Sequence, residues 1–192
     1  MSNTRIWEEY YDHFSYFNKD DIRKGCQPLI MDWGEKRDNS IVLIHGLTDS
    51  PYFMKAIGQR FHEQMGFNVL IPLLQGHGLN EPNGMAGVSL EEWKRNVEFA
   101  IETAKELGTK VSIGGLSTGG ALSVYMALKN PAINGAVFLF SAALDLAGIE
   151  GNIKEILLRT PIANILDFFE DKDLISKFKK LISEIFDRDK NR

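Results

Sequence analysis

A serine lies between glycines in the stretch KVSIGGLSTGGALSVYMA, residues 110–127, where a run of β-forming residues gives way to a helical pattern. Gly115-Leu116-Ser117-Thr118-Gly119 matches G-x-S-x-G, the pattern of a nucleophile elbow. In such a turn the serine hydroxyl projects above the sheet, and the backbone N–H of Thr118 points to where negative charge develops on a substrate oxygen. The stretch therefore predicts Ser117 as a nucleophile. The alternative is a glycine-rich connection whose serine only caps the helix.

The loop IHGLTDSP, residues 44–51, follows an earlier strand and complements the serine. An elbow supplies one oxyanion donor, and the second donor is expected from this earlier loop. Because Gly46 lets the loop pass close to the elbow, we expect the backbone N–H of Leu47 to be that donor. We expect His45 to hold the loop. In the alternative interpretation this is an ordinary strand-to-helix connection in which a polar residue of 48–50 caps the next helix.

A third loop, LLQGHG at residues 73–78, follows the next strand and carries His77. Its glycines predict a tight turn near the mouth of the site, where His77 hydrogen-bonds or lines the entrance. The alternative is a loop histidine that only shapes the turn.

Cys26 is the one cysteine, and its apolar neighbours indicate an inert thiol. Serine chemistry of this kind requires no metal and no organic cofactor, and we expect none.

Alternating strand and helix patterns must position these loops. Short apolar runs predict strands at 28–33, 40–46, 67–73, 110–115 and 135–144. Apolar residues at helical spacing predict helices at 51–65 and 89–108, and the helix-like pattern that starts after the serine predicts a third at 118–130. Ser89 and Glu92 have the spacing of a capping box at the start of the second of these helices. The alternation predicts an α/β fold with a mostly parallel sheet and helices on both faces.

Bulk properties exclude several classes of protein. The 192 residues are 44% hydrophobic and 25% charged, which fits one soluble globular domain. A net charge of −4 argues against a nucleic-acid partner, since neutralising phosphates requires clustered Lys and Arg. The N-terminal stretch is not a signal peptide, and no apolar run approaches the roughly 18 residues of a membrane span. We therefore expect a cytoplasmic protein without a membrane span.

The three loops together resemble those of the α/β-hydrolase superfamily, and within it the carboxylesterase and monoacylglycerol lipase-like branch of serine hydrolases. That branch carries HG-x-T, G-H-G and G-L-S-x-G-G, which read here as residues 45–48, 76–78 and 115–120. The resemblance covers about residues 40–145. It implies Ser117 as nucleophile, Leu47 and Thr118 as backbone oxyanion-hole donors, and a carboxylic ester as substrate.

The helical pattern that runs from about residue 146 to Arg192 occupies the position of the helical cap in that branch. We therefore expect an α/β-hydrolase core over residues 1–145 and a cap-like segment over 146–192 that is not an independent domain. The last strands of the α/β-hydrolase fold have no counterpart in the sequence. An exposed sheet edge would follow, and such an edge allows self-association.

The acid and the histidine that the branch places after the serine also have no counterpart here. All four histidines precede Ser117, at positions 13, 45, 62 and 77. Ser117, His77 and Asp145 form the one substitute arrangement that the chain itself offers. Otherwise the chain is a shortened piece of a longer hydrolase, which is the interpretation we favour, a pseudoenzyme, or a chain whose acid and base come from another polypeptide.

Two functions follow from these patterns. The first is a lipase-like or esterase-like serine hydrolase of carboxylic esters, which as given hydrolyses p-nitrophenyl esters weakly or not at all because its base and acid are missing. The second is a catalytically dead module that binds a fatty-acyl ligand or another protein. A small acyl ester or a fatty-acyl ligand is the expected partner in these two cases.

Overall fold

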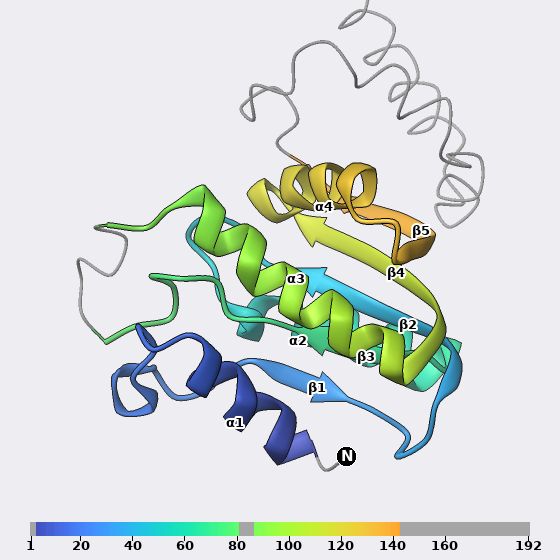
Figure 1. The fold of residues 1–192 in the computed structure, drawn as a ribbon, viewed down its shortest axis with the longest axis horizontal. Coiled ribbons are helices and arrows are strands. Elements are labelled where there is room, and N and C mark those ends of the chain that lie inside the picture. The colour runs from blue at the N-terminus through green and yellow to red at the C-terminus, as the bar shows by residue number, and fades with distance from the viewer. Residues whose placement is uncertain (1–2, 81–86, 143–192) are drawn as a thin grey trace, which may run out of the picture. The chain divides into compact units, whose positions relative to one another are not determined.

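Five strands form the sheet of the computed structural model, which describes residues 3–80 and 87–142 (Figure 1). The strands are β1 (Leu29–Met31), β2 (Arg37–Ile44), β3 (Asn68–Ile71), β4 (Gly108–Leu116) and β5 (Ile133–Phe140). Their order is β1-β3-β2-β4-β5, with β1 antiparallel to β3 and all other pairs parallel. The predicted mostly parallel α/β sheet is confirmed.

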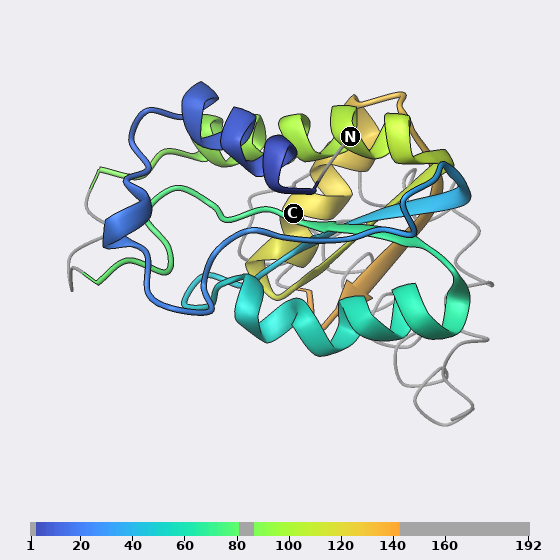
Figure 2. The same ribbon diagram turned by 90° about the horizontal axis from the view of Figure 1, so that it is seen from below.

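Helices cover both faces of this sheet. They are α1 (Asn3–His13), α2 (Pro51–Met65), α3 (Leu90–Leu107) and α4 (Thr118–Lys129), with a short 3-10 turn, η1, at Lys19–Asp21. α2 lies on one face, whereas α1 and α3 lie on the other (Figure 2). α4 shares a core cluster with α3, so it packs on the same face as α3. The amphipathic spacing in the sequence correctly predicted α2 and α3, and the helix-like pattern after the serine correctly predicted α4.

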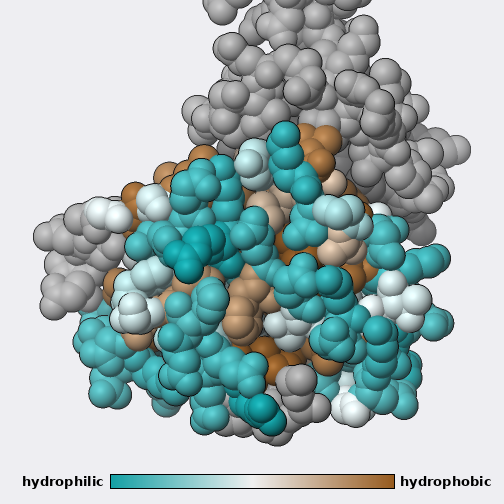
Figure 3. Space-filling model, in the orientation of Figure 1, coloured by the Kyte–Doolittle hydropathy of each residue, from teal (hydrophilic) through white to brown (hydrophobic). Residues whose placement is uncertain are grey.

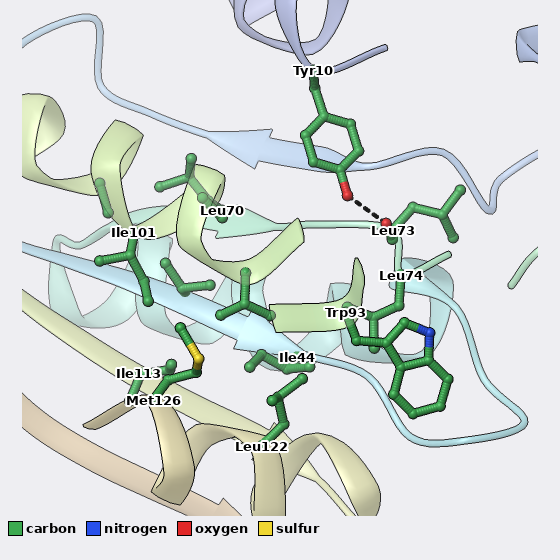
Figure 4. Packing of buried hydrophobic residues seen from close by; sticks show 14 of the residues in the cluster. Tyr10, Ile44, Leu70, Leu73, Leu74, Trp93, Ile101, Ile113, Leu122 and Met126 are labelled. Atoms are coloured by element: carbon green, nitrogen blue, oxygen red, sulfur yellow. Dashed lines mark hydrogen bonds between the residues drawn. The ribbon is translucent and has the colours of Figure 1, made fainter. Parts of the chain in front are cut away.

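The central strand β2 contributes side chains to two separate hydrophobic cores, because alternate side chains of a strand point to opposite faces of the sheet. Val42 and Ile44 join the cluster under α1, α3 and α4 (Figure 4), whereas Ile41 and Leu43 join the cluster under α2. All four side chains are fully buried. Burying an aliphatic side chain of this size stabilises the fold by about 1.5–3 kcal/mol. The continuous apolar run in the sequence therefore reflects a strand covered on both faces.

The start of α3 departs from the predicted capping box. Ser89 Oγ accepts a hydrogen bond from the Glu92 N–H at 3.1 Å, as predicted. The reciprocal bond is replaced, because the Ser89 N–H donates to Gln75 Oε1 at 3.0 Å and the Glu92 carboxylate accepts from Arg95 at 2.7 Å. Half of the capping box is therefore correct, and the other half is taken by a contact with the 73–78 loop that the local sequence does not encode.

Two further differences concern elements at the ends of the described region. The N-terminal residues form α1, which the sequence analysis did not predict, and this helix buries Ile6, Trp7 and Tyr10. β5 ends at Phe140 instead of continuing to residue 144, and Ser141, the residue that follows it, has a φ of 47°. Asp145 and the predicted cap-like segment 146–192 lie outside the described residues.

The surface of the described residues is mostly polar on the face that carries α1 and α3, with smaller apolar areas between the hydrophilic side chains (Figure 3). This agrees with helices whose apolar stripe faces the sheet and whose opposite face is charged. Among the helices of residues 3–80 and 87–142, none combines the length and the apolar character needed to cross a membrane.

Candidate active site

Ser117 occupies a strained turn between β4 and α4. Its backbone has φ 52° and ψ −117°, and its side chain makes no capping hydrogen bond to α4. The Ser117 N–H donates to the Phe140 carbonyl at 3.0 Å, while its own carbonyl accepts from the Gly120 N–H at 2.9 Å. A non-glycine residue in such a conformation costs of order 1–3 kcal/mol and persists only where the surrounding structure imposes it. The helix-capping alternative does not describe this serine.

Two glycines of the elbow are required by close backbone contacts. A Cβ built on Gly115 would collide with the backbone of Gly119, and a Cβ on Gly119 would collide with the carbonyl oxygens of Ile44 and His45. The first turn of α4 therefore lies directly against the end of β2. Only glycine permits this approach, which explains the glycines two positions before and two positions after the serine.

The strand register places the loop after β2 beside the elbow. Ile44 pairs with Gly115, and a Cβ built on Gly46 would lie 3.5 Å from the Leu116 carbonyl oxygen. Within the described residues, the backbone N–H groups of Leu47 and Thr118 donate no hydrogen bond. Two unused N–H donors thus lie on adjacent loops at the carboxyl ends of neighbouring parallel strands. Such a pair can stabilise an oxyanion.

His45 is fully buried beneath this loop, and its ring holds backbone groups on two segments. Nδ1 lies 3.0 Å from the Gly46 carbonyl oxygen, and Nε2 accepts a hydrogen bond from the Leu74 N–H at 3.2 Å. Burial, with a smaller contribution from the neighbouring His77, lowers the pKa of His45 to about 3. The ring is therefore neutral at ordinary pH, and its contacts agree with the expectation that it holds the loop.

His77 is also buried, and its ring contacts the Leu47 loop directly. Nε2 lies 2.7 Å from the Leu47 carbonyl oxygen and Nδ1 lies 3.0 Å from the Gln75 carbonyl oxygen. Both ring nitrogens therefore face backbone carbonyls. This occupancy argues against the substitute arrangement of Ser117, His77 and Asp145, in which a ring nitrogen would have to face the serine hydroxyl.

The remaining candidates from the sequence lie elsewhere. His62 stacks on Trp33 at 4.4 Å and contacts the Phe67 carbonyl at 2.9 Å. Phe67 precedes β3, so His62 lies at the amino-terminal end of that strand, whereas the elbow lies at the carboxyl ends of the strands. His13 ends α1 and packs its ring against Phe14. The partly buried Cys26 accepts a hydrogen bond from Ser50 Oγ at 3.3 Å. No cluster of three potential metal ligands occurs within the described ranges.

Sequence reasoning missed the residues that hold the His77 turn. Gln75 is fixed through its N–H by Asn96 Oδ1 at 2.9 Å and through its carbonyl by Trp93 Nε1 at 3.0 Å. Tyr10 OH donates to the Leu73 carbonyl at 2.5 Å (Figure 4). Trp93 and Asn96 both lie on α3. The one sign of such a contact in the sequence is that Asn96 is a polar residue on the side of α3 that faces the core. Their partners on a loop are not encoded by any local pattern.

Comparison with known proteins gives a consistent result. The sequence model of the hydrolase family described as serine aminopeptidase, S33, matches residues 35–166. A thermostable monoacylglycerol lipase from Bacillus sp. (strain H-257) is 29% identical over 128 residues, which cover 67% of this chain and 49% of the lipase.

Solved structures show the same similarity. The structure reported for the metagenome-derived lipolytic enzymes LipS and LipT has 28% identity and a TM-score of 0.56, covering 63% of this chain and 47% of that chain. Est1E from Butyrivibrio proteoclasticus with bound ferulic acid has 20% identity and a TM-score of 0.51, covering 62% of this chain and 49% of Est1E, and at this identity it shows the fold alone. This chain spans about half the length of these relatives.

Proposed function

Because the chain belongs to the serine aminopeptidase S33 family of α/β-hydrolases, we propose that it carries the nucleophile and the oxyanion-binding groups of a carboxylic ester hydrolase. Ser117 is the nucleophile, and the backbone N–H groups of Leu47 and Thr118 are the oxyanion donors. The relatives whose names describe a monoacylglycerol lipase and lipolytic enzymes support an acyl ester as the substrate class.

The proposed reaction follows from these positions. Ser117 Oγ attacks the ester carbonyl carbon while an imidazole base takes the hydroxyl proton. The carbonyl oxygen becomes an oxyanion, which the N–H groups of Leu47 and Thr118 stabilise more strongly than they stabilise the neutral carbonyl. Collapse breaks the bond to the alcohol, which leaves with the proton. Water then attacks the acyl group on Ser117 and releases the carboxylic acid.

One observation carries the proposal: a non-glycine residue holds φ 52° and ψ −117° at a strand-to-helix turn, although its side chain makes no cap. Strain of this kind needs a compensating role, and exposure of a reactive hydroxyl is the role that a nucleophile elbow supplies. His77, the residue predicted near the mouth of the site, contacts the carbonyl of Leu47, whose N–H is one of the proposed oxyanion donors.

The base is the part of the proposal that the four histidines do not supply. His45 and His77 direct their ring nitrogens at backbone groups, and His13 and His62 lie away from the elbow. We propose that the general base is an imidazole from outside this sequence. Removing the triad base from a serine hydrolase leaves only the acceleration from binding and the oxyanion hole, so the isolated chain should hydrolyse esters weakly.

The test replaces the missing base with free imidazole. Wild-type protein, Ser117→Ala and Ser50→Ala are treated with a fluorophosphonate probe over a range of imidazole concentrations, and the labelled site is found by peptide mapping. Ser50 is the matched control because it lies in the facing loop and its hydroxyl is bonded to Cys26. We expect imidazole-dependent labelling at Ser117 in the wild type and in Ser50→Ala, and none in Ser117→Ala.

The second candidate is an acyl-ligand-binding or interaction module, which is favoured by the engagement of both nearby imidazoles with backbone groups. Absence of labelling in folded wild-type protein at every imidazole concentration would reject the hydrolase proposal. Binding of a fluorescent fatty acid by the same unlabelled protein would then support the module. Equal labelling of wild type and Ser117→Ala would likewise reject Ser117 as the nucleophile.

A further inference from the structure

Two buried imidazoles hold the two peptide groups that flank the Leu47 Cα. The ring centroids of His45 and His77 lie 4.7 Å apart. His45 Nδ1 faces the Gly46 carbonyl at 3.0 Å, and His77 Nε2 faces the Leu47 carbonyl at 2.7 Å. The first carbonyl belongs to the peptide before Leu47 and the second to the peptide after it. The orientation of Leu47 is therefore fixed from both sides.

The tautomer of His45 follows from its partners. Nε2 accepts the Leu74 N–H, so the ring proton resides on Nδ1 and is donated to the Gly46 carbonyl. That carbonyl also accepts the Asp49 N–H at 3.2 Å. In a trans peptide the C=O and N–H point in opposite directions. Fixing the Gly46 carbonyl with two donors therefore aims the Leu47 N–H away from His45, where no described residue accepts it.

His77 acts on the other side of Leu47, and its proton position also follows from its partners. The Gln75 carbonyl accepts from Trp93 Nε1 at 3.0 Å and so has a donor besides His77. The Leu47 carbonyl has no other donor within the described residues. An unprotonated ring nitrogen directs its lone pair at the carbonyl oxygen it faces, and this repulsion is greater at the 2.7 Å of Nε2 than at the 3.0 Å of Nδ1. Nε2 therefore carries a proton and donates it to Leu47.

The turn that carries His77 is held by elements remote from the elbow. On α3, Asn96 Oδ1 and Trp93 Nε1 fix both polar groups of the Gln75 backbone, and from α1 the buried Tyr10 hydroxyl reaches the Leu73 carbonyl (Figure 4). His77 thus projects from a turn with its own supports. Its contact with Leu47 transmits the position of this fixed turn to the more exposed loop.

From this geometry we propose that His77 is a positioning residue, which holds the Leu47 carbonyl through Nε2–H and so aims the Leu47 N–H at the oxyanion. It works with His45, which holds the preceding carbonyl. His77 does not touch the substrate and acts only through Leu47. The inference rests on the proposed function, because the Leu47 N–H has a substrate oxygen to bind only if Ser117 is the nucleophile.

Two substitutions separate the two ring nitrogens. In His77→Gln the side-chain amide N–H reaches about as far as Nε2 and can still donate to the Leu47 carbonyl, whereas the shorter amide of His77→Asn reaches only the position of Nδ1. Misplacing one reacting group by about 1 Å can cost about a hundredfold in rate. We expect fluorophosphonate labelling of Ser117 in free imidazole to slow by about ten- to a hundredfold in His77→Asn. We expect His77→Gln to recover most of that loss.

A second measurement reads the contact without any chemistry at Ser117. Leu47-Thr48 is the only Leu-Thr pair in the sequence, so protein with carbonyl-¹³C leucine and ¹⁵N threonine gives one cross-peak from the Leu47 carbonyl. In His77→Asn, loss of the hydrogen bond should change the chemical shift of the Leu47 carbonyl. In His77→Gln, where the bond is kept, that chemical shift should stay close to the wild-type value. His62→Asn is the matched control, because His62 contacts the Phe67 carbonyl at the amino-terminal end of β3, away from the elbow.

The outcomes distinguish the two proposals. A carbonyl signal that does not move in His77→Asn, or equal rate losses in the Asn and Gln variants, overturns the positioning role. Rate loss of the same size in His62→Asn would also overturn it, since the effect would then be one of general stability. Failure to label wild-type Ser117, with the carbonyl signal still following the variants, would instead overturn the proposed function and leave the His77 contact in place.

Discussion

Replacing Ser117 by glycine should stabilise the protein, although glycine usually destabilises. Ser117 holds φ 52° and ψ −117°, a conformation that glycine adopts without strain. Its side chain makes no capping bond, so the substitution removes no helix cap. Ser117→Ala keeps the Cβ and hence the strain, and it should leave the free energy of unfolding within about 0.5 kcal/mol of wild type.

The magnitude follows from two opposing effects. Relief of the backbone strain contributes about 1–3 kcal/mol. The greater freedom of glycine in the unfolded chain removes about 0.5–1 kcal/mol. The free energy of unfolding of Ser117→Gly should therefore be at least that of Ser117→Ala and exceed it by up to about 2.5 kcal/mol. For a protein of this size each kcal/mol corresponds to about 2–4 °C in the melting temperature.

Urea denaturation followed by tryptophan fluorescence measures this difference, provided that the dependence on urea is the same for all variants. Ser123→Gly is the matched control, because Ser123 lies inside α4 and its hydroxyl donates to the Gly119 carbonyl at 2.8 Å. That variant should lose about 1 kcal/mol or more. If Ser117→Gly is less stable than Ser117→Ala, the elbow is not strained and the reasoning behind the nucleophile assignment fails.

Three further predictions follow from the same contacts. First, the pKa of His45 falls from about 6.5 in the unfolded chain to about 3 in the fold, so the unfolded state binds an extra proton between these values. Urea titrations should therefore show stability falling as the pH drops below about 6.5, by up to about 1.4 kcal/mol per pH unit, and less steeply in His45→Gln. Second, Gly119→Ala should lower the free energy of unfolding by at least about 2 kcal/mol or prevent folding, because its Cβ would collide with the carbonyls of Ile44 and His45. A soluble Gly119→Ala variant with unchanged stability would contradict the close approach of α4 to β2. Third, Tyr10→Phe leaves the Leu73 carbonyl without its buried donor and should lower the free energy of unfolding by about 1–3 kcal/mol, and an unchanged urea midpoint would show that the bond contributes nothing.

Much of the sheet and its covering helices could be predicted because the relevant information is local. The β2 run Ile41-Val42-Leu43-Ile44 is short, apolar on both faces and rich in branched residues, which favours a covered strand. α1 was missed, although Ile6, Tyr10 and Phe14 recur at helical spacing. Charged residues between these positions make the apolar stripe of α1 hard to see in the sequence. The helix also packs against α3, and a local sequence pattern holds no information about that contact.

The candidate site shows the same division. The elbow and the loop after β2 could be located from glycines and from strand ends, because both determine where the backbone turns. The contacts of His77 could not be predicted. They join the 73–78 turn to Leu47, and the turn itself depends on Asn96 and Tyr10 from distant parts of the chain. A histidine in a glycine-rich turn has many partners available, and only the packed fold selects among them.

The most direct test of the central claim traps the acyl group itself. Wild-type protein is mixed with p-nitrophenyl butyrate in free imidazole, quenched in acid, and examined by intact mass and peptide mapping. Weak activation of water should make the acyl group accumulate. We predict one butyryl group per chain, attached to Ser117 and absent from Ser117→Ala. Butyrylation confined to residues other than Ser117 and equal in both proteins, or no butyrylation of folded wild type, would contradict the assignment of Ser117 as the nucleophile.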